Sequence, residues 1–243
     1  MGRSQKSSSP TQGKSKSKRR IRNSATGVGR IPAPGVEFEL QARAEGFRLV
    51  IGIDEAGRGP LAGPVVAAAV AFSDEPFSFS ERIADSKQIS AAQRERAFHE
   101  ILKKARVGVG VISEAVVDSL NILNATHHAM TVAVEDLLGR LPGKVRADKN
   151  FSGSVQLLID GNSFRSELPF ARRLIVKGDQ RCLSIACASI VAKVVRDGIL
   201  KTYDRIYPQW GFGRHKGYPT AAHKKAIAQF GLTPIHRRTF NHV

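Results

Sequence analysis

Acidic side chains follow three of the most apolar segments of this sequence, at the point where each segment ends. The acids are Asp54 and Glu55 after residues 49–53, Asp160 after residues 155–159, and Asp179 after residues 174–176. Short apolar runs rich in Val, Ile and Leu predict buried strands. Because α/β enzymes place their sites at strand ends, these four carboxylates are candidates for one shared site.

Four carboxylates at one edge of a sheet would repel each other strongly unless divalent cations bound between them. Carboxylate oxygens suit Mg²⁺ or Mn²⁺, and such ions need no His or Cys ligand. Two ions about 3.5–4 Å apart can activate a water and stabilise the leaving oxygen in phosphodiester cleavage. The spacing equally allows each acid to be a solvated loop residue, so the two interpretations stay open at this point.

The first pair of acids poses a geometric condition. Neighbouring residues of a strand point to opposite faces, so Asp54 and Glu55 can share a site only if the strand ends or bulges there. The next residues include Gly57, Arg58 and Gly59. Glycines tolerate strained backbone and let a ligand come close, although an ordinary turn is the alternative.

The apolar pattern predicts a mixed α/β sheet with helices on its faces. The expected strands are a hairpin of 49–53 and 65–72, then 107–112, 155–159 and 174–176. The expected helices are 36–47, 91–105 with Ser90 and Gln93 as a capping box, 114–120, 121–138, 184–201, and 221–229 with Thr220 as N-cap. Residues 141–154 and 208–219 are expected to be loops.

Charge is the strongest bulk property of the 243-residue chain, whose net charge is +17. Residues 1–36 hold nine Lys or Arg and no acid, which leaves 29 basic and 21 acidic residues, or +8, in the remainder. A basic balance favours polyanionic partners such as nucleic acid or an anionic membrane. No apolar run reaches the roughly 18 residues of a membrane span.

The two cysteines, Cys182 and Cys187, lie five residues apart in a helical segment and therefore on different faces. We expect free, buried thiols in a reducing compartment, and hence a cytoplasmic protein.

Seven stretches of the sequence resemble ribonuclease HII, the type 2 ribonuclease H, and they come in the order of that family. They are GIDEAGRGPLAGPVVAAAV at 52–70, ADSKQIS at 84–90, LNILNATHHAM at 120–130, LLIDGN at 157–162, VKGDQ at 176–180, SIACASIVAKVVRD at 184–197 and YPQWGFGRHKGYPT at 207–220. The resemblance runs from about residue 50 to the end, roughly four-fifths of the chain.

This resemblance implies a ribonuclease H-like mixed sheet flanked by helices. Residues 35–243 would form the catalytic domain, with a C-terminal helical part from about residue 200 to 243. Residues 1–34 lie outside the match, and their Ser, Lys, Arg, Gly and Pro content predicts a disordered basic tail. Its cluster at 14–22 could bind phosphates, serve as a nuclear address, or have no role.

The resemblance also implies the reaction and its acids. Asp54, Glu55, Asp160 and Asp179 match the four catalytic acids of the family; the first three would hold two Mg²⁺ or Mn²⁺ ions, and Asp179 would join when substrate binds. The enzyme would hydrolyse the RNA strand of RNA–DNA hybrids. It would also cut duplex DNA on the 5′ side of embedded ribonucleotides, leaving 3′-hydroxyl and 5′-phosphate ends.

Further residues match substrate contacts of the family. Gly57, Arg58 and Gly59 match the loop that senses ribose, and Tyr218 matches a tyrosine that stacks on the next, deoxy, sugar. The 2′-hydroxyl is the group that separates RNA from DNA at one position, so close backbone approach fits this task. Ser86 and Lys87 match a phosphate-contacting turn.

Two other classes of function stay in view. An integrase- or transposase-like enzyme of the same fold would use similar carboxylates to join strands, but it has no need of a ribose-sensing loop. A non-catalytic nucleic-acid-binding protein would rely on the basic charge alone. We expect a monomer whose partners are RNA–DNA hybrids and ribonucleotide-containing duplexes. The C-terminus has no stretch that we identify as a sliding-clamp motif, and a clamp partner stays open.

Overall fold

The core of the protein is a five-stranded sheet in the order β3-β2-β1-β4-β5. The computed structural model describes residues 33–73 and 78–241. Strands β1 (Leu49–Ala56), β2 (Val65–Phe72) and β3 (Ala105–Ile112) form an antiparallel meander, whereas β4 (Val155–Asp160) and β5 (Ala171–Ile175) run parallel to β1. The sheet is therefore mixed, as predicted.

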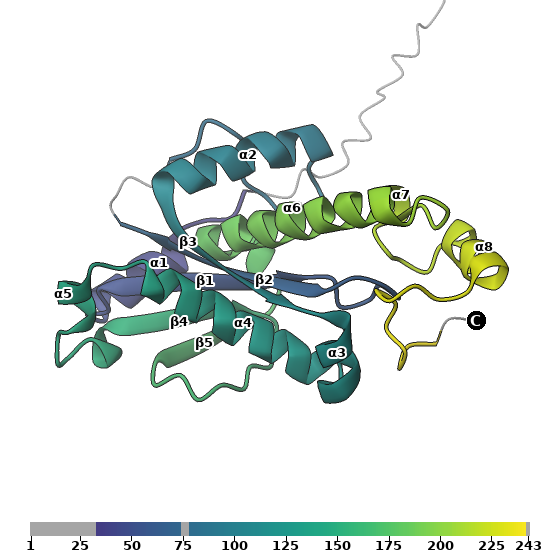
Figure 1. Ribbon diagram of the computed structural model, residues 1–243. Coiled ribbons are helices and arrows are strands. Elements are labelled where there is room, and N and C mark those ends of the chain that lie inside the picture. Colours follow the sequence, from purple (N-terminus) through teal and green to yellow (C-terminus); the bar gives the residue numbers. More distant parts are fainter. Residues whose placement is uncertain (1–32, 74–77, 242–243) are drawn as a thin grey trace, which may run out of the picture. The chain divides into compact units, whose positions relative to one another are not determined.

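One face of the sheet is covered by the long helix α6 (Leu183–Ile206) and by α2 (Ala91–Lys104), as Figure 1 shows. Alternate residues of β2, among them Val66 and Val70, pack there against Ile190 of α6. Gly52 of β1 makes the approach of α6 possible, because a Cβ at this position would lie only 2.3 Å from the backbone carbon of Ser184. The short helix α1 (Glu37–Ala44) lies beside the start of β1.

The opposite face is covered by α4 (Ile122–Gly139), which follows the short α3 (Glu114–Leu120). The other residues of β2, such as Val65 and Ala69, pack there with Met130 and Leu137 of α4. All eight side chains of β2 are buried, since helices cover both faces of this strand. The sheet is thus held rigidly from both sides.

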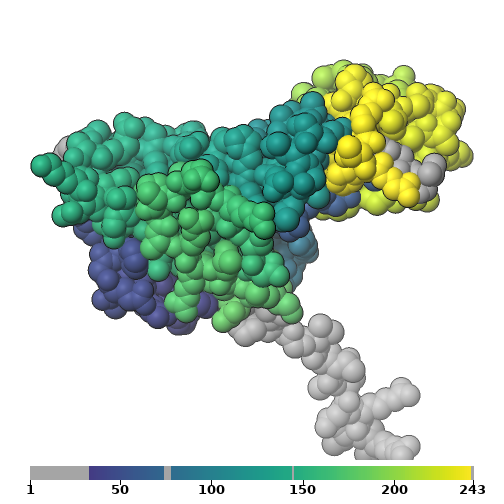
Figure 2. All heavy atoms as spheres, turned by 90° about the horizontal axis from the view of Figure 1, so that it is seen from below, coloured from purple at the N-terminus to yellow at the C-terminus, as the bar shows by residue number. Residues whose placement is uncertain are grey.

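The chain ends in a helical part with α7 (Phe212–His215) and α8 (Ala221–Phe230), at the end of the sheet where β1 and β4 end (Figure 1). Figure 2 shows the residues that follow α8 next to α3. Asp118 of α3 fixes them there, because its carboxylate accepts hydrogen bonds from the backbone N–H groups of Arg238 and Thr239 at 2.7 and 3.0 Å.

Most predicted elements are confirmed, including the capping box of Ser90 and Gln93 at the start of α2. Both cysteines are free and buried. The two predicted loops were wrong in part. Residues 141–154 contain α5 (Gly143–Arg146) and a 3₁₀ turn (Ser152–Ser154), and residues 208–219 contain α7. Each is only three or four residues long, which is too short to show a helical period.

Strand β5 covers Ala171–Ile175 rather than 174–176, because it is an edge strand whose exposed arginines hide the apolar pattern. The predicted basic tail falls on residues 1–34, of which 1–32 lie outside the described residues. Among the described residues, no helix is both long and apolar enough to cross a membrane.

The contact between Gly52 and α6 gives a first prediction. Gly52→Ala should lower the free energy of unfolding by about 1–3 kcal/mol, since the new Cβ must push α6 away from β1. Gly198→Ala is the matched control, because Gly198 is exposed within α6 and has no atom near its missing Cβ. It should stabilise the protein by about 0.5–1 kcal/mol through helix propensity. Urea unfolding of both variants measures this, and equal effects would contradict the packing argument.

Candidate active site

The parallel register of β1 and β4 brings the first two acids together. Ile53 of β1 pairs with Ile159 of β4, so Asp54 and Asp160 follow at equivalent positions of neighbouring strands. Neighbouring strands lie about 4.8 Å apart, and equivalent residues point to the same face. Asp54 is only 5% exposed. The register therefore places two carboxylates side by side at the end of the sheet.

Glu55 joins this pair although β1 neither ends nor bulges at Asp54, contrary to the condition derived from the sequence. The strand continues in regular pairing with β2 to Ala56. Because β4 already ends at Asp160, the other edge of β1 is open beyond Asp54, and the longer side chain of Glu55 reaches the same cleft. Its Oε1 lies 3.4 Å from Nη1 of Arg58.

Asp179 lies in the 3₁₀ turn Gly178–Gln180 that follows β5. This turn is fastened to β4, because the N–H of Gly178 donates a 2.7 Å hydrogen bond to Oδ1 of Asp160. Lys177, just before the turn, has a left-handed backbone with φ of 56°. The turn thus directs Asp179 towards the other acids.

All ten predicted site residues line one cleft of about 470 Å³. They are Asp54, Glu55, Gly57, Arg58, Gly59, Ser86, Lys87, Asp160, Asp179 and Tyr218. Tyr218 lies between α7 and α8 and is 40% exposed, and its ring faces Gly59. Ser86 is buried and accepts a 3.1 Å hydrogen bond from the hydroxyl of Ser189. Segments far apart in the sequence therefore meet at one end of the sheet.

Mutual repulsion and burial dominate the electrostatics of the cleft. Burial raises the pKa of Asp54 well above its ordinary range, and the charges of Glu55 and Asp160 add to this shift. Burial also raises the pKa of Glu55, against the effect of Arg58. Burial and the neighbouring charges of Asp85 and Asp160 raise the pKa of Asp179 to about 6. Negative charge is therefore crowded around the buried Asp54.

Comparison with known proteins assigns the chain to a family. Residues 51–243 match the family model of ribonuclease HII. The chain belongs to the ribonuclease HII family. It is an endoribonuclease that hydrolyses the RNA strand of RNA–DNA hybrids.

Individual relatives support this assignment over most of their length. The chain is 49% identical over 207 residues to a ribonuclease HII of Ruminiclostridium cellulolyticum, which covers 84% of this chain and 74% of the relative. It is 45% identical to a ribonuclease HII of Magnetococcus marinus, over 87% of this chain and 94% of that relative. Among solved structures, a chain of the PCNA:RNase HII complex from Archaeoglobus fulgidus is similar with a TM-score of 0.61 at 25% identity, covering 79% of this chain and 95% of that one.

Helix α6 contributes three further residues to the cleft that the sequence analysis missed. Ser189, Lys193 and Arg196 line it, and Lys193 forms a 2.7 Å ion pair with Asp197. Their spacing of four and three residues places them on one helix face. Polar residues at this spacing, within a helix otherwise rich in small apolar side chains, are the signal that could have identified them.

The donor set of the cleft fits hard divalent cations, since it consists of carboxylate oxygens crowded together in a buried place. Within the described part of the chain, no three His, Cys, Asp or Glu side chains enclose a metal position by themselves. Repulsion between the carboxylates favours such an open arrangement. An ion bound here would need oxygens of water or substrate to complete its coordination, as catalytic sites for Mg²⁺ do.

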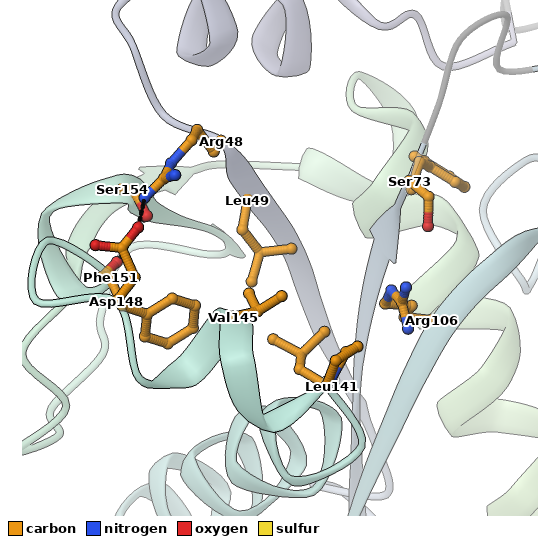
Figure 3. Close-up of a pocket in the computed structure, with 11 residues that line it drawn as sticks. Arg48, Leu49, Ser73, Arg106, Leu141, Val145, Asp148, Phe151 and Ser154 are labelled. Atoms are coloured by element: carbon orange, nitrogen blue, oxygen red, sulfur yellow. Dashed lines mark hydrogen bonds and ion pairs between the residues drawn. The ribbon is translucent and has the colours of Figure 1, made fainter.

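A second cavity of similar size, about 480 Å³, lies at the opposite end of the sheet (Figure 3). Apolar side chains such as Leu49, Leu141 and Phe151 line it, and its nearest charges include the 2.6 Å ion pair of Arg48 and Asp148. None of the predicted site residues lies there. The two cavities have similar volumes, and they differ in that only the cleft is lined by the four carboxylates.

The buried charge predicts that the acids of this ribonuclease HII oppose its folding when no cation is present. When the pKa of a carboxyl is raised in the folded state, the free energy of unfolding falls as the pH rises above the ordinary pKa of that group, so Asp54 is destabilising at neutral pH. Asp54→Asn should therefore raise the melting temperature in a chelator, by roughly 2–4 °C for each kcal/mol relieved.

Asp118→Asn is the matched control of opposite sign. Burial alone would raise the pKa of Asp118, but hydrogen bonds from Thr239 and Arg238 outweigh this effect and lower it. Neutralising Asp118 should therefore lower the melting temperature under the same conditions. A lower melting temperature in both variants would contradict the assigned repulsion at Asp54.

Proposed function

We propose that this enzyme cleaves duplex DNA on the 5′ side of embedded ribonucleotides, as well as RNA in hybrids, and leaves 3′-hydroxyl and 5′-phosphate ends. Asp54, Glu55 and Asp160 are the metal ligands in this proposal, and Asp179 completes the site when substrate is bound. Two Mg²⁺ or Mn²⁺ ions, when bound, would activate the attacking water and stabilise the leaving oxygen. The observation that carries the proposal is the meeting of these acids with the loop 57–59 and Tyr218 in one cleft.

The remaining residues of the cleft have tasks that follow from their chemistry. The backbone of Gly57 and Gly59 can approach a 2′-hydroxyl closely because no side chain intervenes. Arg58 has a half-exposed side chain whose planar guanidinium can hold a phosphate. Lys87 is exposed at the rim and supplies a further positive charge. The ring of Tyr218 can stack on the deoxyribose that follows the ribonucleotide, where a 2′-hydroxyl would be crowded.

The deciding experiment uses a DNA duplex with one internal ribonucleotide beside the same duplex made only of DNA. We expect one cut on the 5′ side of the ribonucleotide, dependent on Mg²⁺ or Mn²⁺ and abolished by a chelator. Asp54→Asn should abolish hydrolysis and keep hybrid binding, because the basic rim is unchanged. Product ends can be read by gel mapping with and without phosphatase. Cutting of the all-DNA duplex, or full activity of Asp54→Asn, would refute the proposal.

We also propose that the basic residues at the N-terminus add to nucleic-acid affinity without taking part in the chemistry. Removal of residues 1–34 takes away nine Lys or Arg. Hybrid binding should weaken, and the slope of log K against log salt should become shallower by about 0.9 for each phosphate that these residues neutralise. Fluorescence anisotropy at several salt concentrations measures this. Turnover of the saturated complex should be unchanged, and an inactive truncated enzyme would contradict the accessory role.

A further inference from the structure

The residues that follow α8 return to the loop after β1 and pair with it. Ala62 and His236 form an antiparallel bridge. The N–H of Gly63 donates to the carbonyl of Ile235 at 2.9 Å, and the N–H of Arg237 donates to the carbonyl of Leu61 at 2.9 Å. The segment 233–237 is therefore bound by its backbone to the loop that begins with Gly57.

Arg237 extends this contact with a fully buried side chain. Its Nη2 donates to the carbonyls of Gly57 at 2.6 Å and Gly63 at 2.7 Å, and Nε donates to Gly63 at 3.0 Å. Its Nη1 donates to the carbonyls of Arg58 at 3.0 Å and Pro60 at 2.9 Å. All five N–H groups of the guanidinium thus hold the backbone of one loop. This fixes the left-handed conformation of Gly57, whose φ is 103°.

The guanidinium of Arg237 keeps its charge in this buried place. Burial, and then the neighbouring charge of Arg196, lower its pKa to about 10, which is still well above neutral pH. Within the described residues neither arginine forms a direct ion pair: carbonyl oxygens accept the hydrogen bonds, and the charge of Glu114 acts on both arginines without such contact. A lysine at position 237 could reach only part of this set, because its ammonium lacks the planar fork.

His236, the neighbour of Arg237, connects the segment 233–237 to Tyr218 through His223. The N–H of Thr233 donates to Nδ1 of His236 at 2.8 Å, so in the neutral ring the proton of His236 lies on Nε2. That Nε2 lies 3.1 Å from Nε2 of His223, which must then accept. His223 therefore carries its proton on Nδ1 and donates to the carbonyl of Tyr218 at 2.9 Å. The three contacts assign one tautomer to each ring.

The hydrogen-bonded rings of His236 and His223 are enclosed in the C-terminal part. His223 is 0% and His236 1% exposed. The ring of His215 stacks on His223 with centroids 4.2 Å apart, and Phe212 packs edge-on against His223 at 5.5 Å. The backbone of Tyr218 is thus held from inside the molecule, while its ring is exposed in the cleft next to Gly59.

We propose that the segment 233–237 is the positioning element for ribonucleotide recognition, with Arg237 and His236 as positioning residues. Arg237 holds the loop 57–59, which meets the ribose at the cut. His236 acts through His223 to hold Tyr218, which meets the next sugar. Neither side chain touches the substrate. This inference rests on the proposed roles of the loop 57–59 and Tyr218, and it adds the residues that set their geometry.

The test for His236 uses two variants that each keep one half of its contacts. His236→Gln can place an amide N–H near the position of Nε2 and keep the bond to His223. His236→Asn keeps an acceptor near the position of Nδ1 for Thr233 but cannot reach His223. The readout is the ratio of kcat/KM for a duplex with one ribonucleotide to kcat/KM for a uniform RNA–DNA hybrid. The folded fraction of each preparation cancels in this ratio.

His236→Asn should lower the ratio about tenfold, the effect of one well-placed hydrogen bond, whereas His236→Gln should stay within about twofold of the wild type. Tyr218→Ala should lower the ratio at least as far as His236→Asn. An unchanged ratio in His236→Asn, with a lowered ratio in Tyr218→Ala, would overturn the inference and leave the proposed function intact. An unchanged ratio in Tyr218→Ala would instead refute the role of Tyr218 in the proposed function.

Arg237→Lys tests the other connection. The loop 57–59 meets the ribose at the cut in both substrates, so kcat should fall about tenfold or more for both, with little change in KM and in the ratio. Melting temperatures of Arg237→Lys and His236→Asn show whether each variant is folded at the assay temperature. If the ratio of the two kcat/KM values falls equally in Arg237→Lys and His236→Asn, the separate roles of Arg237 and His236 are overturned. Such a result would indicate that each variant loosens the whole cleft.

Discussion

The parallel register of β1 and β4 is the constraint on which the site depends. It places Asp54 and Asp160 side by side, and both strands are too firmly packed to move apart. The side chains of Ile53 and Ile159, one residue earlier on each strand, are fully buried in the core cluster under α4. Repulsion between the two acids therefore cannot be relieved by adjusting the backbone. The two carboxylates therefore keep a negative potential between them that favours binding of divalent cations. A site whose charges are fixed before the ligand binds is preorganised.

The buried positive charges in the same region, on Arg196 and Arg237, are stabilised by backbone carbonyls. Arg196 and Arg237 are both fully buried, and both direct their N–H groups at backbone carbonyls. An acid paired directly with either guanidinium would add negative charge close to the carboxylates of the cleft. Carbonyl oxygens satisfy the same donors without a full charge, so the arginines keep a positive field near the cleft. They also fix the loop between β1 and β2, whose own sequence of Gly and Pro would not hold one conformation.

The sequence was sufficient for the parts of the fold that depend on local patterns. The strands around Asp54 and Asp160 follow from apolar runs, and α2 follows from the capping box of Ser90. The reach of Glu55 could not be predicted, because it depends on β4 ending two positions earlier than β1 along a shared edge. Ser189 and Lys193 were missed because they lie in a helix rich in small residues, a composition that by itself indicates close packing on a sheet. Arg237 carried no local signal either, since its role exists only once the segment 233–237 lies against the loop.

The placement of the loop 57–59 is consequently a long-range property of the chain. The bonds of Arg237 join residues 174 to 180 positions apart in the sequence. In contrast, the hydrogen bond from Gly178 to Asp160 spans only 18 positions, and it lies within adjacent strands and turns of the sheet. The acids are therefore placed by the sheet and its turns, whereas the loop 57–59 and Tyr218 are held by contacts with the C-terminal part. The contacts that position the acids are thus separate from the contacts that hold the loop 57–59 and Tyr218, although both sets meet in one cleft.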